Sequence, residues 1–230
     1  MIDFNYYTLN EARNATGVVV VIDVLRAFTT AAHAFDVGAI KILPVAGVDE
    51  AVQLRTEIPG SLIMGEVNGE KPAGFDFGNS PAAIRELDLS GRILIQRTSA
   101  GTQGIVSALN ADHVLAASFV VAKSTAEVIL RLNPAVVSFI ITGESMGRDG
   151  DEDRACAEYI QGMVKAETPD PVFFTQRVSR STAGRSFLIK NDQSTLPMDL
   201  NLSIHANAFP FALPVKREGS KWVMYREKAK

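Results

Sequence analysis

The sequence alternates short apolar runs with longer segments of helical periodicity, and this pattern restricts the fold more than any other feature. The runs are rich in β-branched residues and have no polar face, as in GVVVVIDV at residues 17–24. Such runs are typical of strands that are buried on both sides. When they alternate with helices, they imply a mainly parallel sheet with right-handed crossovers. We therefore expect a three-layer α/β protein, in which helices cover both faces of a central sheet.

The boundaries of the elements follow from the apolar runs and from the glycines and prolines between them. The predicted strands are Gly17–Val24, Ala39–Val45, Ser61–Met64, Arg92–Gln96, Asp112–Ala117 and Ala135–Thr142. The predicted helices are Arg26–Val37 and Asp49–Glu57, with three more that begin near Gly101, Ala122 and Gly150.

The pattern loosens after about residue 168. Short strand-like runs remain at Ser186–Ile189, Phe211–Val215 and Trp222–Tyr225. They favour an antiparallel edge of the sheet, a sub-lobe over residues 168–230, or a surface for a homodimer. We treat residues 1–230 as a single domain, because no repeat or low-complexity linker divides the chain.

Composition argues against several classes of protein. The formal net charge is −3 and the basic residues are mostly scattered, which disfavours a nucleic-acid partner. No apolar run approaches the roughly 18 residues of a membrane span, and the first residues lack the pattern of a signal peptide. The single cysteine, Cys156, cannot form an internal disulfide. We expect a cytoplasmic protein without a membrane partner.

Reactive side chains follow the first predicted strand. Ligands of open α/β sheets bind beyond the carboxyl ends of the strands, and Asp23 and Arg26 stand at such an end, with Thr29 just inside the helix. A carboxylate there can hold Mg²⁺ or act as nucleophile or base, and an arginine can bind phosphate oxygens. The alternative is an aspartate that caps the helix beside a solvated arginine.

A loop from Gly65 to Pro81 follows the third strand and is too long for a simple connection. Glu66 and Asp76 are candidates for metal binding or acid–base chemistry, and Asn68 and Asn79 for hydrogen bonding. Ser80 and Pro81 are expected to open the next helix. The alternative is a structural loop packed by its two phenylalanines.

Two further turns carry polar groups. The segment RTSAGTQG, residues 97–104, can present hydroxyls, backbone amides and the Arg97 charge to an anion, but it is not a P-loop. An ordinary capped turn is the alternative. Residues 142–153 hold the densest acidic cluster, and its spacing is not that of an EF-hand. Its members are Glu144, Asp149, Asp151, Glu152 and Asp153, of which we favour Glu152 or Asp153 as metal ligands.

These segments together resemble the 2-phosphosulfolactate phosphatase (ComB) family. The matching segments are IDVLRAFTT (22–30), GEVNG (65–69), GFDFGNSP (74–81), the turn at 98–102 and Glu152-Asp153. The resemblance implies an α/β fold and a Mg²⁺-dependent phosphatase that converts 2-phospho-3-sulfolactate to sulfolactate and phosphate, a step of coenzyme M biosynthesis. Ala100 and Val120 replace polar residues of the family pattern, which extends the expected substrates to related small phosphorylated hydroxy acids.

The candidate residues fall into three groups by expected role, and the expected substrate for all of them is a small anionic phosphorylated molecule. Candidate catalytic residues are Asp23, Arg26, Glu66 and Arg97, with the two arginines as anion clamps. Candidate substrate-binding residues are Thr29, Asn68, Asn79, Ser80, Thr98, Ser99, Gly101, Thr102 and Ser118. Candidate metal ligands are Asp23, Glu66, Asp76, Glu144, Glu152 and Asp153.

Other functions stay open on the same fold. The carboxylates could serve a lyase or isomerase as acid and base, or the protein could bind a small anion without catalysis. For a phosphatase, either a water molecule or Asp23 itself could attack phosphorus.

Overall fold

The apolar runs become strands of one sheet, because a strand with no polar face is stable only when both faces are covered. The computed structural model describes residues 2–144, 147–189 and 196–228. Within these residues the strand order is β1–β7–β2–β6–β8–β9–β3–β5–β4, and β10 pairs with β8. The strands are β1 (Asp3–Thr8), β2 (Gly17–Ile22), β3 (Lys41–Val45), β4 (Leu62–Gly65), β5 (Ile93–Arg97), β6 (Ala111–Ala117), β7 (Val136–Ile141), β8 (Phe211–Glu218), β9 (Lys221–Met224) and β10 (Glu227–Lys228).

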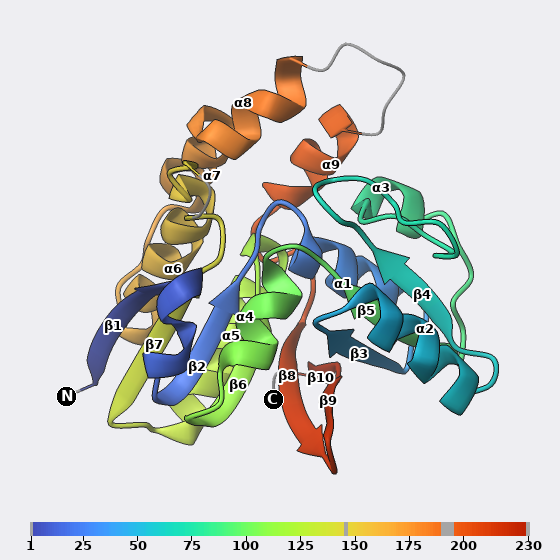
Figure 1. The fold of residues 1–230 in the computed structure, drawn as a ribbon. Coiled ribbons are helices and arrows are strands. Elements are labelled where there is room, and N and C mark those ends of the chain that lie inside the picture. The colour runs from blue at the N-terminus through green and yellow to red at the C-terminus, as the bar shows by residue number, and fades with distance from the viewer. Residues whose placement is uncertain (1, 145–146, 190–195, 229–230) are drawn as a thin grey trace.

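Helices cover both faces of the sheet, which confirms the predicted fold class (Figure 1). In β2, Val19 and Val21 pack in one core cluster with residues of α1 and α4. The alternate residues Val18 and Val20 pack on the other face with α5 and α6. The helical elements are η1 (Leu9–Asn14), α1 (Ala27–Asp36), α2 (Val48–Glu57), α3 (Pro81–Ile84), α4 (Gly101–Ser107), η2 (Phe119–Val121), α5 (Ala122–Leu132), α6 (Asp151–Val164), α7 (Pro171–Arg180), α8 (Thr182–Ile189) and α9 (Leu196–Ser203).

The sheet contains two groups of parallel strands. One group is β1, β7, β2 and β6, and the other is β3, β5 and β4. The hairpin β8–β9 lies between them and pairs antiparallel with β6 on one side and with β3 on the other. Three successive antiparallel pairings reverse the strand direction, so a flat sheet would place the carboxyl ends of the two groups at opposite edges.

The two groups nevertheless bring their carboxyl ends together, because the second group lies obliquely to the first (Figure 1) and sheet twist accumulates over many strands. One core cluster spans both groups and includes Val21 of β2, Ile42 of β3 and Leu94 of β5. At the carboxyl end of β5, Gln96 Nε2 donates a hydrogen bond of 2.9 Å to the carbonyl of Ala27 in α1. The turns after β2, β4, β5 and β7 therefore surround one region.

The predictions before residue 168 are confirmed with element ends shifted by at most two residues, although β1 was not predicted. After residue 168 they are partly wrong. The strands β8 and β9 form as predicted, but they lie inside the sheet and not at its edge. Ser186–Ile189 belongs to helix α8, because four residues are too few for periodicity to separate strand from helix.

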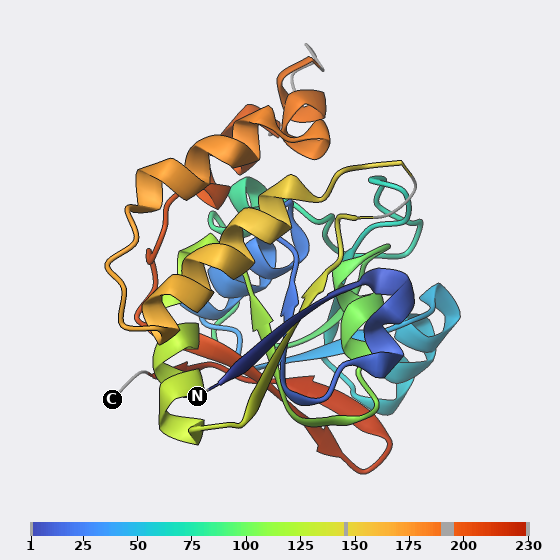
Figure 2. The same ribbon diagram turned by 90° about the vertical axis from the view of Figure 1, so that its left-hand side faces the viewer.

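The helices α7 and α8 extend along one side of the molecule above α6 (Figure 2). Helix α9 brings the chain back to α3 and η2, near the carboxyl ends of the strands. Among the described residues, no helix combines the length and the apolar character that crossing a bilayer requires.

Candidate active site

The turn after β2 carries Asp23, whose carboxylate is almost completely buried. Its Oδ1 accepts a hydrogen bond of 2.9 Å from the Ala27 amide, which holds the carboxylate against the start of α1. The described residues donate no hydrogen bond to Oδ2. Burial, strengthened by the charges of Glu66 and Glu152, raises the pKa of Asp23 to about 6. Perturbed carboxyls of this kind are typical of functional sites.

Two acidic residues from the first turn of α6 lie beside Asp23. Asp153 accepts the Val24 amide on Oδ1 at 2.8 Å and the Gly143 amide on Oδ2 at 2.7 Å. It therefore joins the turn after β2 to the turn after β7. Glu152 is buried, and its Oε2 has no hydrogen-bond partner among the described residues. Burial raises the pKa of both carboxyls, that of Asp153 well above its usual range.

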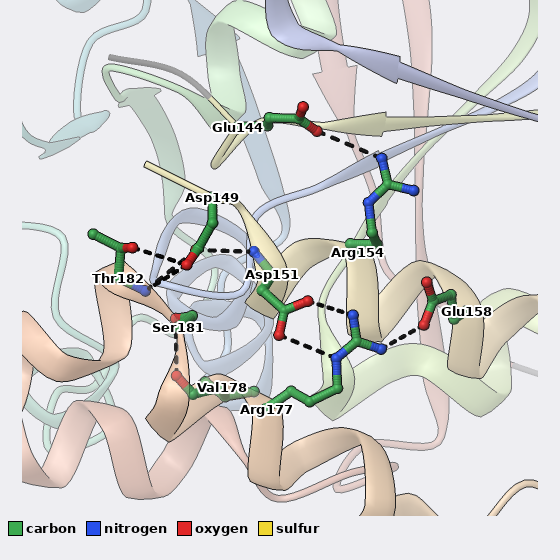
Figure 3. Close-up of polar contacts among 9 residues, drawn as sticks. All are labelled: Glu144, Asp149, Asp151, Arg154, Glu158, Arg177, Val178, Ser181 and Thr182. Atoms are coloured by element: carbon green, nitrogen blue, oxygen red, sulfur yellow. Dashed lines mark hydrogen bonds and ion pairs between the residues drawn. The ribbon is translucent and has the colours of Figure 1, made fainter. Parts of the chain in front are cut away.

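The other acids of this segment lie near the surface, where neighbouring side chains engage them (Figure 3). Their partners are Arg154 for Glu144 (3.5 Å), Thr182 for Asp149, and Arg177 for Asp151. The structure thus separates the five acids into two groups. Glu152 and Asp153 are buried, and the other three contact side chains of α6, α7 and α8 nearer the surface. Metal binding by Glu144 stays a prediction that this geometry does not favour.

Glu66 joins the long loop after β4 to the turn after β5. Its Oε1 accepts the Ser99 amide at 2.6 Å, and its Oε2 accepts the Ser99 hydroxyl at 3.1 Å. Oε2 also accepts the Gly69 amide at 2.6 Å. The Asn68 amide, in a residue with a φ of 53°, donates to Ser99 Oγ at 2.9 Å. These bonds fix the two turns that flank Asp23 on the side of the second strand group.

Arg97, at the end of β5, is bound to the same loops. Its Nε donates to the Ala46 carbonyl at 3.2 Å, and its Nη1 donates to the Glu66 carbonyl at 2.9 Å. These contacts give Arg97 a structural part in the turns after β3 and β4. Its use as an anion clamp stays a prediction.

Arg26 is held by a carboxylate from the far end of the sequence. Its Nη1 donates to Oδ2 of Asp199 at 2.6 Å, and Phe187 lies 5.2 Å from the guanidinium carbon. Asp199 is completely buried and also accepts the Ser80 hydroxyl at 2.7 Å. Ser80 caps α3 as predicted, since its Oγ accepts the Ala83 amide.

Gly101 lets α4 begin directly against Asp23. A Cβ at this position would lie 2.7 Å from Ala27 Cβ and 2.8 Å from Asp23 Oδ2. Any larger residue would therefore displace the carboxylate or the helix. Thr98 and Thr102 close the preceding turn, because the amide of each donates to the hydroxyl of the other.

The remaining predicted residues differ in their surroundings. Thr29 Oγ1 donates to the Val24 carbonyl at 2.9 Å and stabilises the turn after β2. Asn79 Oδ1 and Ser118 Oγ are buried and have no hydrogen-bond partner among the described residues; their part in substrate binding stays a prediction. Asp76 lies apart from Asp23, at the amino end of β4, where it accepts the Ile63 amide at 2.7 Å and pairs with Arg55.

The donor set fits a divalent cation bound by few protein ligands. The described residues contain no group of three or more His, Cys, Asp or Glu side chains placed to hold a metal ion. Asp23 Oδ2 and Glu152 Oε2, however, are carboxylate oxygens without a hydrogen bond from the described residues. Mg²⁺ commonly takes one or two carboxylates and completes its shell with water and substrate phosphate, so Asp23 and Glu152 are compatible with it.

Sequence analysis missed two charged residues of this region. Arg148 lies close enough for its charge to lower the pKa of both Asp23 and Glu152. Arg148 is the one basic residue in the acidic segment at residues 142–153, and this isolated positive charge was a signal that could have identified it. Asp199 opens the segment DLNLSIHANAFPFALPV, which is weakly similar to the family, but the stretch has no strong periodicity and no role was predicted for this residue.

Comparisons with known proteins identify the family to which this chain belongs. The family model described as 2-phosphosulpholactate phosphatase matches residues 5–198. A protein of Carboxydothermus hydrogenoformans named "Probable 2-phosphosulfolactate phosphatase" is 35% identical over 83% of this chain and 80% of its own length. A Bacillus subtilis protein of the same name is 40% identical, and the match covers 64% of this chain and 63% of that protein. A relative from Thermus thermophilus with this name is 32% identical over 71% of this chain and 70% of its own length. The chain belongs to the 2-phosphosulfolactate phosphatase family.

Proposed function

We propose that this protein hydrolyses 2-phospho-3-sulfolactate, or a related small phosphorylated hydroxy acid, to the hydroxy acid and phosphate. The observation that carries the proposal is the buried carboxylate group of Asp23, Glu152 and Asp153 where the strand ends converge, in a region whose first turn also carries Arg26. Family membership supports the phosphatase reaction, and the relatives' names supply the substrate. The protein's place in coenzyme M biosynthesis belongs to the same proposal.

The proposal includes Mg²⁺ as cofactor, held by Asp23 and Glu152. Bound there, the ion would supply positive charge to the phosphoryl oxygens and lower the energy of the transition state. Two observations support it. The charge of Glu152 raises the pKa of Asp23, and both charges raise the pKa of Asp153. Each of the two proposed ligands also has an oxygen without a described hydrogen bond. Asp153 would orient the turn and not bind the ion, because both its oxygens accept backbone amides.

The chain's own residues would bind and orient the substrate. Arg26 would contact an anionic oxygen of the substrate, since a guanidinium binds phosphate and sulfonate groups through parallel hydrogen bonds. Asn79 Oδ1 could accept a hydrogen bond from the hydroxy-acid portion, and Ser118 Oγ could bind there as donor or acceptor. Arg97 and Glu66 would hold the surrounding turns in place.

A phosphate-release assay over a panel of phosphorylated hydroxy acids, with Mg²⁺ and with EDTA, tests the proposal. We expect release from 2-phospho-3-sulfolactate or a close analogue only with Mg²⁺. Asp23→Asn should reduce that release by about a thousandfold or more, the scale seen when a group that acts in the transition state is removed. Asp36→Asn, which changes an exposed carboxylate at the other end of α1, is the control and should keep full activity.

Several results would contradict the proposal. Full Mg²⁺-dependent activity of Asp23→Asn would remove Asp23 from the reaction. Conversion of a carboxylated metabolite without phosphate release would favour a lyase or isomerase. Tight phosphate binding without turnover on any substrate would favour an anion-binding protein. Within the phosphatase proposal, trapping with beryllium fluoride followed by mass analysis distinguishes attack by Asp23 from attack by water.

A further inference from the structure

Asp199 connects three segments that are distant in the sequence. It is completely buried, and its Oδ2 accepts Arg26 Nη1 at 2.6 Å. Its Oδ1 accepts the Ser80 hydroxyl at 2.7 Å and the Ala82 amide at 2.9 Å. One carboxylate therefore fixes both the turn after β2 and the start of α3. Asp199 lies one residue beyond the match to the family model, which ends at residue 198.

The contacts of Arg26 leave part of its guanidinium available. Phe187 covers the group at 5.2 Å, and Nη1 donates to Asp199. No acceptor among the described residues binds Nε or Nη2, although the side chain is only 12% exposed. Neither nitrogen is fully buried, so both remain accessible to solvent in the free protein. The oxygens of an anionic ligand would satisfy these two nitrogens in a bidentate arrangement.

We infer that Asp199 is a positioning residue, which directs Arg26 Nε and Nη2 toward the anionic oxygens of the substrate. The inference rests on the proposed function, because it names the group that Arg26 binds. Arginine loses considerable rotamer entropy when it is immobilised. Since Asp199 fixes the side chain in the free protein, less of that entropy is lost on binding. Helix α9 thereby becomes part of the substrate-binding wall.

A double-mutant cycle between Arg26 and Asp199 tests the inference. The variants are Arg26→Ala, Asp199→Asn and their combination, each checked for folding by circular dichroism. Dissociation constants for inorganic phosphate are measured by calorimetry with Mg²⁺ present, together with kcat and KM for phosphate release. Asn201→Ala, an exposed change on the same helix, is the matched control and should behave as the wild type.

We expect Asp199→Asn to weaken phosphate binding and raise KM by about tenfold, a coupling typical of residues in direct contact. In the Arg26→Ala background the same change should have no further effect, because Asp199 acts through Arg26. Asp199→Glu keeps the charge and should restore part of the affinity. If Asp199→Asn does not fold, the cycle is run with Asp199→Glu, whose side chain is longer by one methylene and displaces the guanidinium. Its effect on phosphate affinity should also disappear in the Arg26→Ala background.

The outcomes distinguish this inference from the proposed function. Unchanged phosphate affinity in Asp199→Asn, or equal effects of the change with and without Arg26, would overturn the positioning role even in an active phosphatase. Coupled phosphate binding without turnover on any substrate would support the positioning role and reject the phosphatase. A wild-type protein that neither binds nor releases phosphate would reject both.

Discussion

Gly101 shows how one small residue sets the position of the candidate active site. Its missing side chain leaves room for Ala27 and for the free oxygen of Asp23. We expect Gly101→Ala to lower the free energy of unfolding by about 1–3 kcal/mol, the usual cost of forcing a methyl group into packed structure. Phosphate release should fall by about tenfold to a hundredfold, because small displacements of reacting groups have large effects on rate.

Urea unfolding and the phosphate-release assay measure both effects of Gly101→Ala. Gly47→Ala is the control, since Gly47 has a φ of −108° and its added Cβ would make only ordinary contacts at 3.8 Å. Equal losses in the two variants would show that steric contact at Asp23 is not the cause.

At the scale of residues, the sequence indicated which acidic residues belong to the candidate site better than it indicated which residues contact them. Asp23, Glu152 and Asp153 could be predicted because acidic residues directly follow strands or begin a helix. Their burial could not, since it depends on how two strand groups are oriented in the folded sheet. The partner of Arg26 was also beyond prediction, because Asp199 lies 173 positions away along the chain.

At the scale of elements, an ion-pair cluster attaches α7 to the first turns of α6. Arg177 binds both Asp151 and Glu158, and these hydrogen bonds raise its pKa further above the usual range (Figure 3). The side chains are partly exposed, so solvent screens the interaction. We expect Arg177→Gln to lower the free energy of unfolding by about 0.5–1 kcal/mol and to increase amide hydrogen exchange in α7.

Hydrogen exchange followed by mass spectrometry locates the effect of Arg177→Gln. Lys221→Gln removes the more exposed Lys221–Glu57 pair and serves as the control. Faster exchange spread evenly over the whole chain, or no change in α7, would argue against a local attachment of this helix by Arg177.

Element types were predictable wherever an apolar run was long or a helix carried clear capping signals. The strands β2 and β7 belong to the first kind, and α3, capped by Ser80, to the second. The place of the β8–β9 hairpin was not predictable, because pairing between β9 and β3 joins residues 42 and 224. Local periodicity contains no information about such a distant partner.

At the scale of the whole molecule, the shared core cluster predicts that both strand groups unfold together. Val21, Ile42 and Met224 belong to one buried cluster, and Met224 pairs with Ile42 across the junction of the groups. We expect coincident urea transitions when unfolding is followed by far-ultraviolet circular dichroism and by fluorescence of Trp222, which lies in the hairpin.

Met224→Ala provides the corresponding perturbation. Loss of this buried side chain should cost about 2–5 kcal/mol and shift both transitions equally. Exposed Met198→Ala is the matched control and should shift neither transition appreciably. Two separated transitions in the wild type would indicate that the strand groups are independent units and would contradict the single-domain prediction.

The buried carboxylates also determine how stability depends on pH. In the folded protein the pKa of Asp23 rises from 3.8 to about 6, and those of Glu152 and Asp153 are raised as well. Between the ordinary and raised values the folded state therefore binds more protons than the unfolded state, so stability falls as pH rises through this window. Without metal, wild-type protein should be more stable at pH 5.0 than at pH 7.5, by about 1–2 kcal/mol from Asp23 alone.

Two changes should remove much of this dependence. Asp23→Asn eliminates the buried charge, so at pH 7.5 in EDTA it should be at least as stable as the wild type while phosphate release is lost. Mg²⁺ bound to Asp23 should stabilise the wild type at pH 7.5 by mass action and stabilise Asp23→Asn much less. Urea unfolding of both proteins and of Asp36→Asn, at two pH values with EDTA or Mg²⁺, measures these terms. If the wild type in EDTA gained stability as pH rose, Asp23 would not be an uncompensated buried charge. If Mg²⁺ stabilised all three proteins equally, Asp23 would not be a ligand of the ion.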